Sequence, residues 1–395
     1  MIIKALFKNF YSFYEESELS FEVGKKPSPS FYDINLENGL KLNKVIAVLG
    51  ANGSGKTQFI KPMAFLRWFI VDSFLKGDPG SGIPIQGHRF HSDEPTEFEI
   101  QFIIAGVEYK YRLVLTDHHV KHESLYQKTS KQFSYLFVRE KTDSGYDYKQ
   151  KGFGFHAAQA KQIRENASLL GAAFNYDVEG SEKFIRYFSQ VSANVQVLGR
   201  SDVDFSTVIE SAEFFHKNPD YKGDMNHHMC HFDLGLSEII VKESIGQLDT
   251  GEKQTLYVPF GVHKNGDKWF EMPFFEESSG TRSAFVLLRR VLPILKHGGS
   301  LFIDEIDNDL HPHMLPHLLE LFKHPETNPH EAQIVFTCHT PEIINFLKKH
   351  QVYLVEKQHQ YSEAWRLDGV QGVRADDNLY AKYMAGALSA VPELA

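Results

Sequence analysis

The sequence predicts an α/β fold in which a parallel sheet wound with helices is joined to an antiparallel β-lobe. Three observations support this prediction. A buried-type apolar run at 45–49 leads through glycines into helical spacing over 58–74. From residue 281 onward, helical and apolar strand segments alternate, as in a βα-wound sheet. Short segments rich in β-forming residues in the first part of the chain predict further strands. We expect these strands to pair as hairpins, which would form the antiparallel lobe.

The composition is that of a water-soluble globular protein. Of the 395 residues, 24% are charged and 42% are hydrophobic, and this hydrophobic fraction is enough for a large core. The net charge of −9 gives no general attraction to nucleic acid, so such binding would need a local basic patch. Two cysteines exclude a disulfide framework, and the longest apolar segment, 63–75, carries two charges. We therefore expect a cytoplasmic protein with no membrane contact.

The first part of the chain is expected to hold strands at 2–10, 18–23 and 45–49, the helix 58–74, a loop over 76–95, and a hairpin formed by 96–104 and 108–115. The last part is expected to hold strands at 237–242, 255–262, 268–273, 300–303, 333–337 and 351–356, with helices at 281–295, 312–323 and 341–349.

Between 117 and 231 the pattern weakens. Helical spacing at 156–170 and 182–191, with no period-2 run, predicts a mainly helical insertion. Positive charge gathers there at 121–131 and 149–164; we expect a solvated face, with a partner or nucleic-acid surface as the alternative. The predicted organisation is a discontinuous head, 1–116 with 232–395, interrupted by a lid at 117–231.

The strongest motif is the glycine-rich loop Gly50–Thr57, which matches G-x-x-x-x-G-K-[ST]. Backbone N–H groups of such a loop surround phosphate oxygens, the lysine reaches the β- and γ-phosphates, and the last hydroxyl binds Mg²⁺. A glycine-rich turn without a ligand is disfavoured, because a strand precedes the loop and a helix follows it. The predicted phosphate-binding residues are Asn52, Gly53, Ser54, Gly55, Lys56 and Thr57.

An apolar strand at 300–303 ends in Asp304 and Glu305. At the carboxyl edge of a parallel sheet, Asp304 can hold Mg²⁺ and Glu305 can orient or deprotonate a water molecule. On their own the two acids read equally well as a helix cap. About 250 residues separate Lys56 from Asp304, which is long for a P-loop kinase or a small GTPase and requires an insertion.

Two further motifs fall near the acidic strand. Ser278–Thr281 opens a helix, so its hydroxyl and free N–H groups form a site for a terminal phosphate, and His339 follows the next strand. An N-cap and a hydrogen-bonded structural histidine are the simpler readings of each motif alone. The clusters His227–His231 and His311–His317 lack a second ligand set at zinc spacing, so we do not expect zinc.

In this order, the motifs resemble the ABC-type ATPase heads of the SMC/RecF/OLD superfamily. The resemblance implies a P-loop NTPase fold with ATP and Mg²⁺ as cofactors. By this resemblance, Gly50–Thr57 is the Walker A motif and Ser278–Thr281 is the signature motif. Asp304 and Glu305 are the Walker B pair, Asp307 and Asn308 are the D-loop, and His339 is the switch histidine. The implied catalytic residues are Glu305 and His339. The Q-loop glutamine beside the metal is Gln86 or Gln101, with Gln86 preferred because it lies in a loop.

Most of the chain is similar to RloA-like ATPases, stand-alone heads of bacterial anti-phage systems. The similar segments are 3–10, 97–100, 233–236, 277–281, 304–312 and 383–392. Two positions depart from the family: Tyr11 stands where a basic residue is usual, and no arginine follows Gly386.

The likeness implies a function in which ATP joins two subunits. Ser278 and Gly280 of one chain would contact, in trans, the γ-phosphate held by Lys56 of the other, and hydrolysis would open the homodimer or higher homo-oligomer. It also implies a separate effector, such as a TOPRIM-type nuclease or a toxin, and a phage-encoded trigger. A RecF-like DNA-repair ATPase that binds nucleic acid directly and a P-loop kinase are the alternatives.

Overall fold

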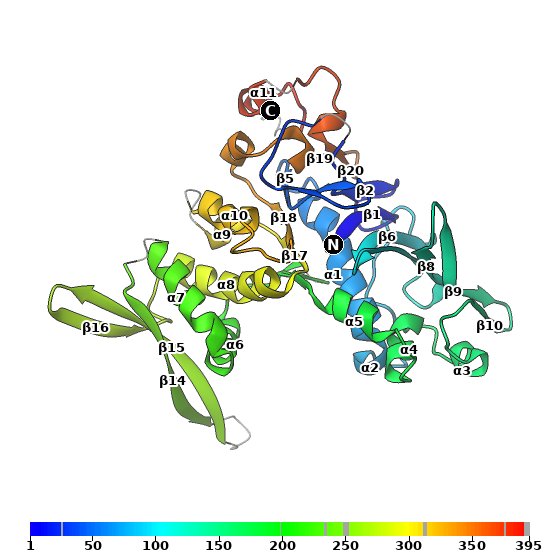
Figure 1. Cartoon of the computed structure of the whole chain (residues 1–395), viewed down its shortest axis with the longest axis horizontal. Coiled ribbons are helices and arrows are strands. Elements are labelled where there is room, and N and C mark those ends of the chain that lie inside the picture. The colour runs from blue at the N-terminus through cyan, green and yellow to red at the C-terminus, as the bar shows by residue number, and fades with distance from the viewer. Residues whose placement is uncertain are drawn as a thin grey trace.

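The computed structural model describes residues 1–24, 27–197, 199–232, 235–247, 253–310, 314–374 and 377–390. Two large sheets lie on either side of helix α1 (Lys56–Val71), which runs through the centre of the molecule (Figure 1). The predicted combination of a helix-wound parallel sheet and an antiparallel lobe is confirmed. Within the described ranges, no helix combines the length and the apolar character needed to cross a bilayer.

The antiparallel sheet has seven strands in the order β10-β9-β8-β7-β6-β1-β2. Its hairpin turn at Ala105 and Gly106 has positive φ at both residues (48° and 76°), as a two-residue hairpin requires. The strands are β1 (Ile2–Lys8), β2 (Ser17–Ser20), β6 (Thr96–Ile104), β7 (Val107–Leu115), β8 (Val120–Lys128), β9 (Phe133–Thr142) and β10 (Gly145–Gln150).

The second sheet has six strands in the order β11-β17-β18-β5-β19-β20, and all neighbouring pairs are parallel except β19 with β20. Its strands are β11 (Val191–Ala193), β17 (Ser300–Ile303), β18 (Gln333–Thr337), β5 (Val45–Leu49), β19 (Val352–Gln358) and β20 (Tyr361–Arg366). The connections carry α8 (Ser279–His297), α10 (Leu315–Lys323) and the 3₁₀ helix η2 (Pro341–Phe346), which is the form taken by the helix predicted at 341–349.

Strand β5 is buried on both faces, which explains its continuous apolar sequence. Ile46 and Val48 pack in the core shared with α1 and the antiparallel sheet. Val45, Ala47 and Leu49 pack in the opposite core, with α8 and α10. The P-loop that follows β5 is therefore anchored in both cores of the protein.

The part of the mixed, mainly helical insertion before residue 156 is not helical, because β8, β9 and β10 extend the antiparallel sheet there. The period-2 pattern is hidden because Glu123 and Arg139 occupy fully buried positions where apolar residues would be expected, and because the register of β8 shifts at Leu125 and Tyr126. The helical prediction holds beyond these strands, where α3 (Ala157–Lys161), α4 (Leu169–Asn175), α5 (Glu182–Ser189), α6 (Phe205–Lys217) and α7 (Lys222–His231) follow. The division of the chain at 117 and 231 stays a prediction.

Glu123 and Arg139 lie 3.7 Å apart and fasten the segment 163–170 to the sheet. Glu123 accepts hydrogen bonds from the Tyr111 hydroxyl (2.9 Å) and from the backbone N–H of Leu169 (2.7 Å) at the start of α4. Arg139 donates to the backbone carbonyls of Ile163, Arg164 and Ala167. Both charges are thus buried with partners, as charges inside a protein must be.

A separate three-stranded sheet, β14 (Glu238–Gln247), β15 (Lys253–Asn265) and β16 (Lys268–Pro273), projects from the left of the molecule (Figure 1). A tight turn at Gly266 and Asp267 joins β15 to β16. The remaining elements are β3 (Asp33–Asn35), β4 (Lys41–Asn43), β12 (Val195–Gln196), β13 (Gly199–Arg200), α2 (Ser73–Lys76), α9 (Ile306–Asp309), α11 (Leu379–Met384), η1 (Pro219–Tyr221), η3 (Lys349–Gln351) and η4 (Leu367–Gly369).

Candidate functional site

The glycine-rich loop turns from β5 into α1 in a conformation that only glycine allows at two positions. Gly50 and Gly55 have φ of 157° and 112°. A Cβ on Gly50 would lie 2.2 Å from the carbonyl oxygen of Val355, and one on Gly55 would lie 2.6 Å from the Ser362 hydroxyl. The loop therefore sits tightly against β19 and β20, with the N-terminus of α1 behind it.

Two serines from distant segments form hydrogen bonds that support the loop. Ser362 Oγ on β20 lies 2.6 Å from the carbonyl oxygen of Ser54 and 2.8 Å from Ser12 Oγ. The backbone N–H of Ser362 also donates to the carbonyl of Ser12 (2.7 Å). Sequence analysis missed both serines, because neither stands in a motif.

The Lys56 side chain is hydrogen-bonded to the backbone of its own loop. Its Nζ donates to the carbonyl oxygens of Gly50 (2.9 Å) and Ala51 (3.1 Å). Burial lowers the pKa of Lys56, and the nearby carboxylates of Asp304 and Glu305 act in the opposite direction. The loop thus presents an ammonium group at the point where its backbone N–H groups converge.

The P-loop and the acidic strand meet at Asp304, as predicted. Thr57 Oγ1 donates to one carboxylate oxygen of Asp304 (2.7 Å) and Thr337 Oγ1 donates to the other (2.6 Å). Asp304 is buried at the ends of β17 and β18, next to the start of α1. A hydroxyl and a carboxylate side by side are the oxygen ligands that Mg²⁺ prefers.

A hairpin built from β11, β12 and β13 holds the backbone of Asp304. The Asn194 side chain accepts from the Asp304 N–H (2.7 Å) and donates to the Asp304 carbonyl (3.0 Å). Arg200 Nε donates to the same carbonyl (3.1 Å). Sequence analysis missed Asn194 and Arg200, since they lie in the weakly patterned segment about 110 residues earlier in the chain.

Glu305 lies beside Asp304 in a left-handed backbone conformation, with φ of 50°. Its carboxylate is 3.5 Å from His339 Nε2 and accepts a hydrogen bond from the Asn308 amide (2.8 Å). A non-glycine residue in this conformation is uncommon, and functional sites are among the places where such residues gather. The structure thus brings the predicted catalytic glutamate and histidine into contact.

Asp307 fixes the segment that carries His339. One of its carboxylate oxygens accepts from the His339 N–H (2.8 Å) and from the Thr340 hydroxyl (3.0 Å). The other oxygen, Oδ1, is buried and has no hydrogen-bond partner within the residues described. His339 is therefore connected to Asp307 and to Glu305, and Glu305 is in turn connected to Asn308.

The two glutamines predicted for the Q-loop lie in different places. The backbone carbonyl of Gln86 accepts from the N–H of Tyr11 (2.9 Å), next to Ser12, whereas Gln101 is in the middle of β6 and bonds Glu99. A third glutamine, Gln196, is exposed on β12, two residues from Asn194. Sequence analysis missed Gln196, although its hairpin contacts Asp304.

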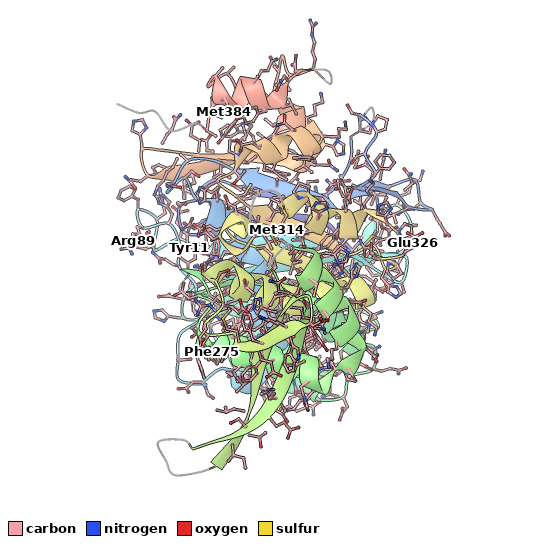
Figure 2. All side chains as sticks on the ribbon, turned by 90° about the vertical axis from the view of Figure 1, so that its left-hand side faces the viewer. Tyr11, Arg89, Phe275, Met314, Glu326 and Met384 are labelled. Carbon is pink, nitrogen blue, oxygen red and sulfur yellow. The ribbon has the colours of Figure 1, made fainter. Side chains whose placement is uncertain are left out.

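Ser278 caps helix α8, where its Oγ accepts from the N–H of Thr281 (3.1 Å). Gly280 follows in the first turn, and Ser278 is exposed. Helix α8 begins on the side of the projecting sheet, away from the P-loop at the centre (Figure 1). Figure 2 faces that side and labels Phe275, just before the cap. No hydrogen bond joins Ser278 to the P-loop within the described residues.

The described residues contain no group of three or more His, Cys, Asp or Glu side chains that could hold a metal ion. On α7, His231 Nδ1 lies 2.8 Å from the backbone carbonyl of His227, which is an ordinary intrahelical contact. His311, Pro312 and His313 lie outside the described residues, as do Asp233, Leu234 and the segment 391–395.

A protein-family model described as "AAA domain, putative AbiEii toxin, Type IV TA system" matches residues 45–166 and 183–345, well over half of the chain. The chain belongs to this AAA-domain family. The matched part of this AAA-domain protein contains the P-loop, Asp304, Glu305, Ser278 and His339, together with the hairpin that bonds Asp304.

Solved structures similar to the AAA-domain chain include SMC heads. The SMC head domain from Thermotoga maritima is 13% identical with a TM-score of 0.42, over 92% of this chain and 98% of that one. A SmcHead bound to the C-winged helix domain of ScpA is 14% identical with a TM-score of 0.46, over 93% and 98%. An Smc head with the C-terminal domain of ScpA from Pyrococcus furiosus is 12% identical with a TM-score of 0.42, over 93% and 96%. No curated protein matches the chain.

Proposed function

We propose that this AAA-domain protein is an ATP-hydrolysing molecular switch. The observation that carries the proposal is the contact of Thr57 with Asp304 (2.7 Å), beside the Glu305–His339 pair. These four residues come from the P-loop helix and from the ends of two neighbouring parallel strands. Phosphoryl-transfer sites in P-loop proteins have this combination of groups.

The residues fit ATP and Mg²⁺. Backbone N–H groups from Asn52 to Gly55 and the Lys56 ammonium would hold the β- and γ-phosphates, while Thr57 and Asp304 would hold the metal ion. Bound Mg²⁺ supplies positive charge that offsets the charge on the phosphate oxygens. For the metal-side glutamine we retain Gln86 as a candidate and add Gln196, whose hairpin bonds Asp304.

Glu305 is proposed to act on the attacking water. The water oxygen forms the new bond to the γ-phosphorus, its proton passes to the carboxylate, and the bond to the bridging oxygen breaks to release ADP. His339 and Asn308 contact the carboxylate and keep it in place. Such a base accelerates the chemical step by about 10²–10⁴-fold.

We infer that two copies bind ATP between them. The exposed start of α8, with Ser278 and Gly280, offers free N–H groups and a positive helix end to the γ-phosphate bound on a second copy. Because α8 begins beside the projecting sheet and α1 lies at the centre (Figure 1), we propose that Ser278 reaches the nucleotide of a second subunit.

The finer role we propose is that of an RloA-like sensor or scaffold in bacterial anti-phage defence. It would control a separate effector, such as a TOPRIM-type nuclease or a toxin, in response to a phage-encoded trigger. The support is the description of the matching family, which names a toxin–antitoxin system. The segment 117–231 is the proposed lid that contacts something other than ATP.

The test is a Mg²⁺-dependent ATPase assay on the parent protein and on Glu305→Gln, with Glu320→Gln on the exposed face of α10 as the control. We expect Glu305→Gln to bind ATP but to turn it over at least 100-fold more slowly, and the control to match the parent. Equal turnover by Glu305→Gln would contradict the assigned role. Stimulation by duplex DNA would favour the RecF-like alternative, and phosphate transfer to an acceptor would favour the kinase.

A further inference from the structure

A cavity of about 680 Å³ lies along the flank of α1. Its walls are α1, the turn after β1, and the consecutive strands β11 and β12, with Arg290 of α8. Cavities of 300–1,000 Å³ with mostly apolar walls and a few polar groups are the usual form of small-molecule sites. The ATPase proposal uses one residue of its lining, Gln196, and assigns no role to the rest of the cavity.

Aromatic rings dominate the cavity wall. Phe10, Tyr11, Phe65 and Trp68 all line it, and Phe65 and Trp68 lie on the same side of α1 as Lys61. Aromatic walls favour a planar ring, because stacked or edge-on rings attract beyond the area they bury. The side chain of Ala64 leaves the middle of the α1 wall open.

The charges on the wall are all positive. Lys61, Arg67 and Arg290 line the cavity, and no carboxylate is among the residues that line it. Arg67 pairs with Asp72 (2.7 Å), and Arg290 donates to the backbone carbonyl of Ala193 (2.7 Å). The cavity therefore attracts anions.

Lys61 is the most informative of these cations. It is only 6% exposed, its Nζ donates to the Val197 carbonyl (2.6 Å), and it lies 4.0 Å from the centre of the Tyr11 ring. The Asp304 carboxylate acts on it only from a distance, and within the described part of the chain no carboxylate forms an ion pair with it. A buried ammonium group with only a carbonyl and a ring as partners is poorly compensated, so an anion in the cavity would stabilise it.

We propose that this cavity binds a small planar aromatic anion, that is, an aromatic ring bearing a phosphate or a carboxylate. The ring would lie against Tyr11 and Trp68, and the anionic group would meet Lys61. The same hairpin that walls the cavity holds Asp304 through Asn194, so a bound molecule lies against the segment that positions the metal-binding carboxylate.

Isothermal titration with two probes, AMP and indole-3-acetate, tests the proposal and separates the two sources of such an anion. The titrations use Lys56→Ala, which weakens nucleotide binding at the P-loop and makes the outcome independent of ATP hydrolysis; any binding left at the P-loop is recognised because it survives a block of the cavity. We expect saturable 1:1 binding of at least one probe. Added to this background, Ala64→Trp should abolish binding by filling the cavity, and Lys61→Met should weaken it at least tenfold.

Two controls make the result specific. Arg289→Gln removes a cation that neighbours Arg290 in sequence but pairs with Glu210 outside the cavity, so it should leave binding unchanged. Neutral indole should bind the Lys61→Met protein and the parent equally. The proposal is overturned if neither anion binds, if Ala64→Trp binds as well as the parent, or if indole binds as tightly as indole-3-acetate.

Discussion

The Thr57 hydroxyl donates a 2.7 Å hydrogen bond to the carboxylate of Asp304, although the two residues lie 247 positions apart in the sequence. The contact forms because β5 and β17 both flank β18, so that their carboxyl ends reach the same edge of the sheet. One bond thus joins the phosphate-binding loop to the acid predicted to hold the metal.

Replacing Lys56 by alanine is expected to weaken ATP binding by about 10- to 100-fold, because a hydrogen bond to a charged group contributes about 1.5–3 kcal/mol. The measurement is the dissociation constant of a fluorescent ATP analogue. Lys76→Ala, at the exposed end of α2, is the matched control and should bind like the parent. Tight binding by Lys56→Ala would show that the loop does not hold the phosphates through this ammonium.

The metal-side glutamine can be identified by comparing Gln196→Ala with Gln86→Ala. Because Gln196 lies on the hairpin that bonds Asp304, we expect Gln196→Ala to raise the Mg²⁺ concentration for half-maximal turnover by about 10- to 100-fold, the cost typical of residues that support a metal site. Gln86→Ala should have little effect. A shift confined to Gln86→Ala would instead restore the sequence-based assignment.

The proposed dimer depends on the cap of α8. Ser278→Asp retains an acceptor for the Thr281 N–H, so the helix stays capped, but its negative charge repels a γ-phosphate. We expect this variant to unfold at the same denaturant concentration as the parent and to remain monomeric with ATP in light scattering. ATP-dependent dimers of Ser278→Asp would rule out the assigned contact. The comparison variant is Ser279→Asp, which places the same negative charge one position further along the exposed start of α8.

Burial lowers the pKa of Lys61 from 10.5 to about 8. Since the folded pKa lies below the unfolded one, burying this ammonium costs stability below about pH 8, and the cost disappears as pH rises toward 10.5. Lys61→Met should therefore be more stable than the parent at pH 7, with a gap that closes between pH 8 and 10.5. Urea unfolding across this range tests it; exposed Lys131→Met should give no such closing gap.

The buried pair in the antiparallel sheet should be important for stability. Glu123→Gln leaves Arg139 without a compensating charge, so we expect a loss of about 3–5 kcal/mol in the free energy of unfolding. Glu165→Gln breaks the more exposed pair with Lys141 and should cost less than about 1 kcal/mol. A similar loss in both variants would show that the buried pair has no special role.

The sequence was sufficient for the groups that act within local motifs. Gly50–Thr57 and Asp304–Glu305 were predicted because a phosphate loop and an acid after a buried strand need particular residues at fixed spacing. Ser12, Ser362, Asn194 and Arg200 were not predicted, because each is a single polar residue whose role depends on which distant segment it meets. No local sequence pattern indicates which distant segment such a residue will contact.

The strands β8–β10 were missed for a different reason. Hydrophobic alternation identifies a half-buried strand only when its inward positions are apolar, and here Glu123 and Arg139 occupy two of them. These charges are tolerated because helix ends and backbone carbonyls supply their partners. Those partners, in 163–170, could not be assigned before the fold was known.

The order of strands in the parallel sheet also has a consequence for synthesis. Strand β5 is made early, but its two neighbours, β18 and β19, are made almost 300 residues later. During translation, which proceeds at about 5–20 residues per second, the nascent chain therefore carries its apolar central strand without partners for tens of seconds. This makes the growing polypeptide a natural client for chaperones, and the site can form only when residues near 350 have left the ribosome.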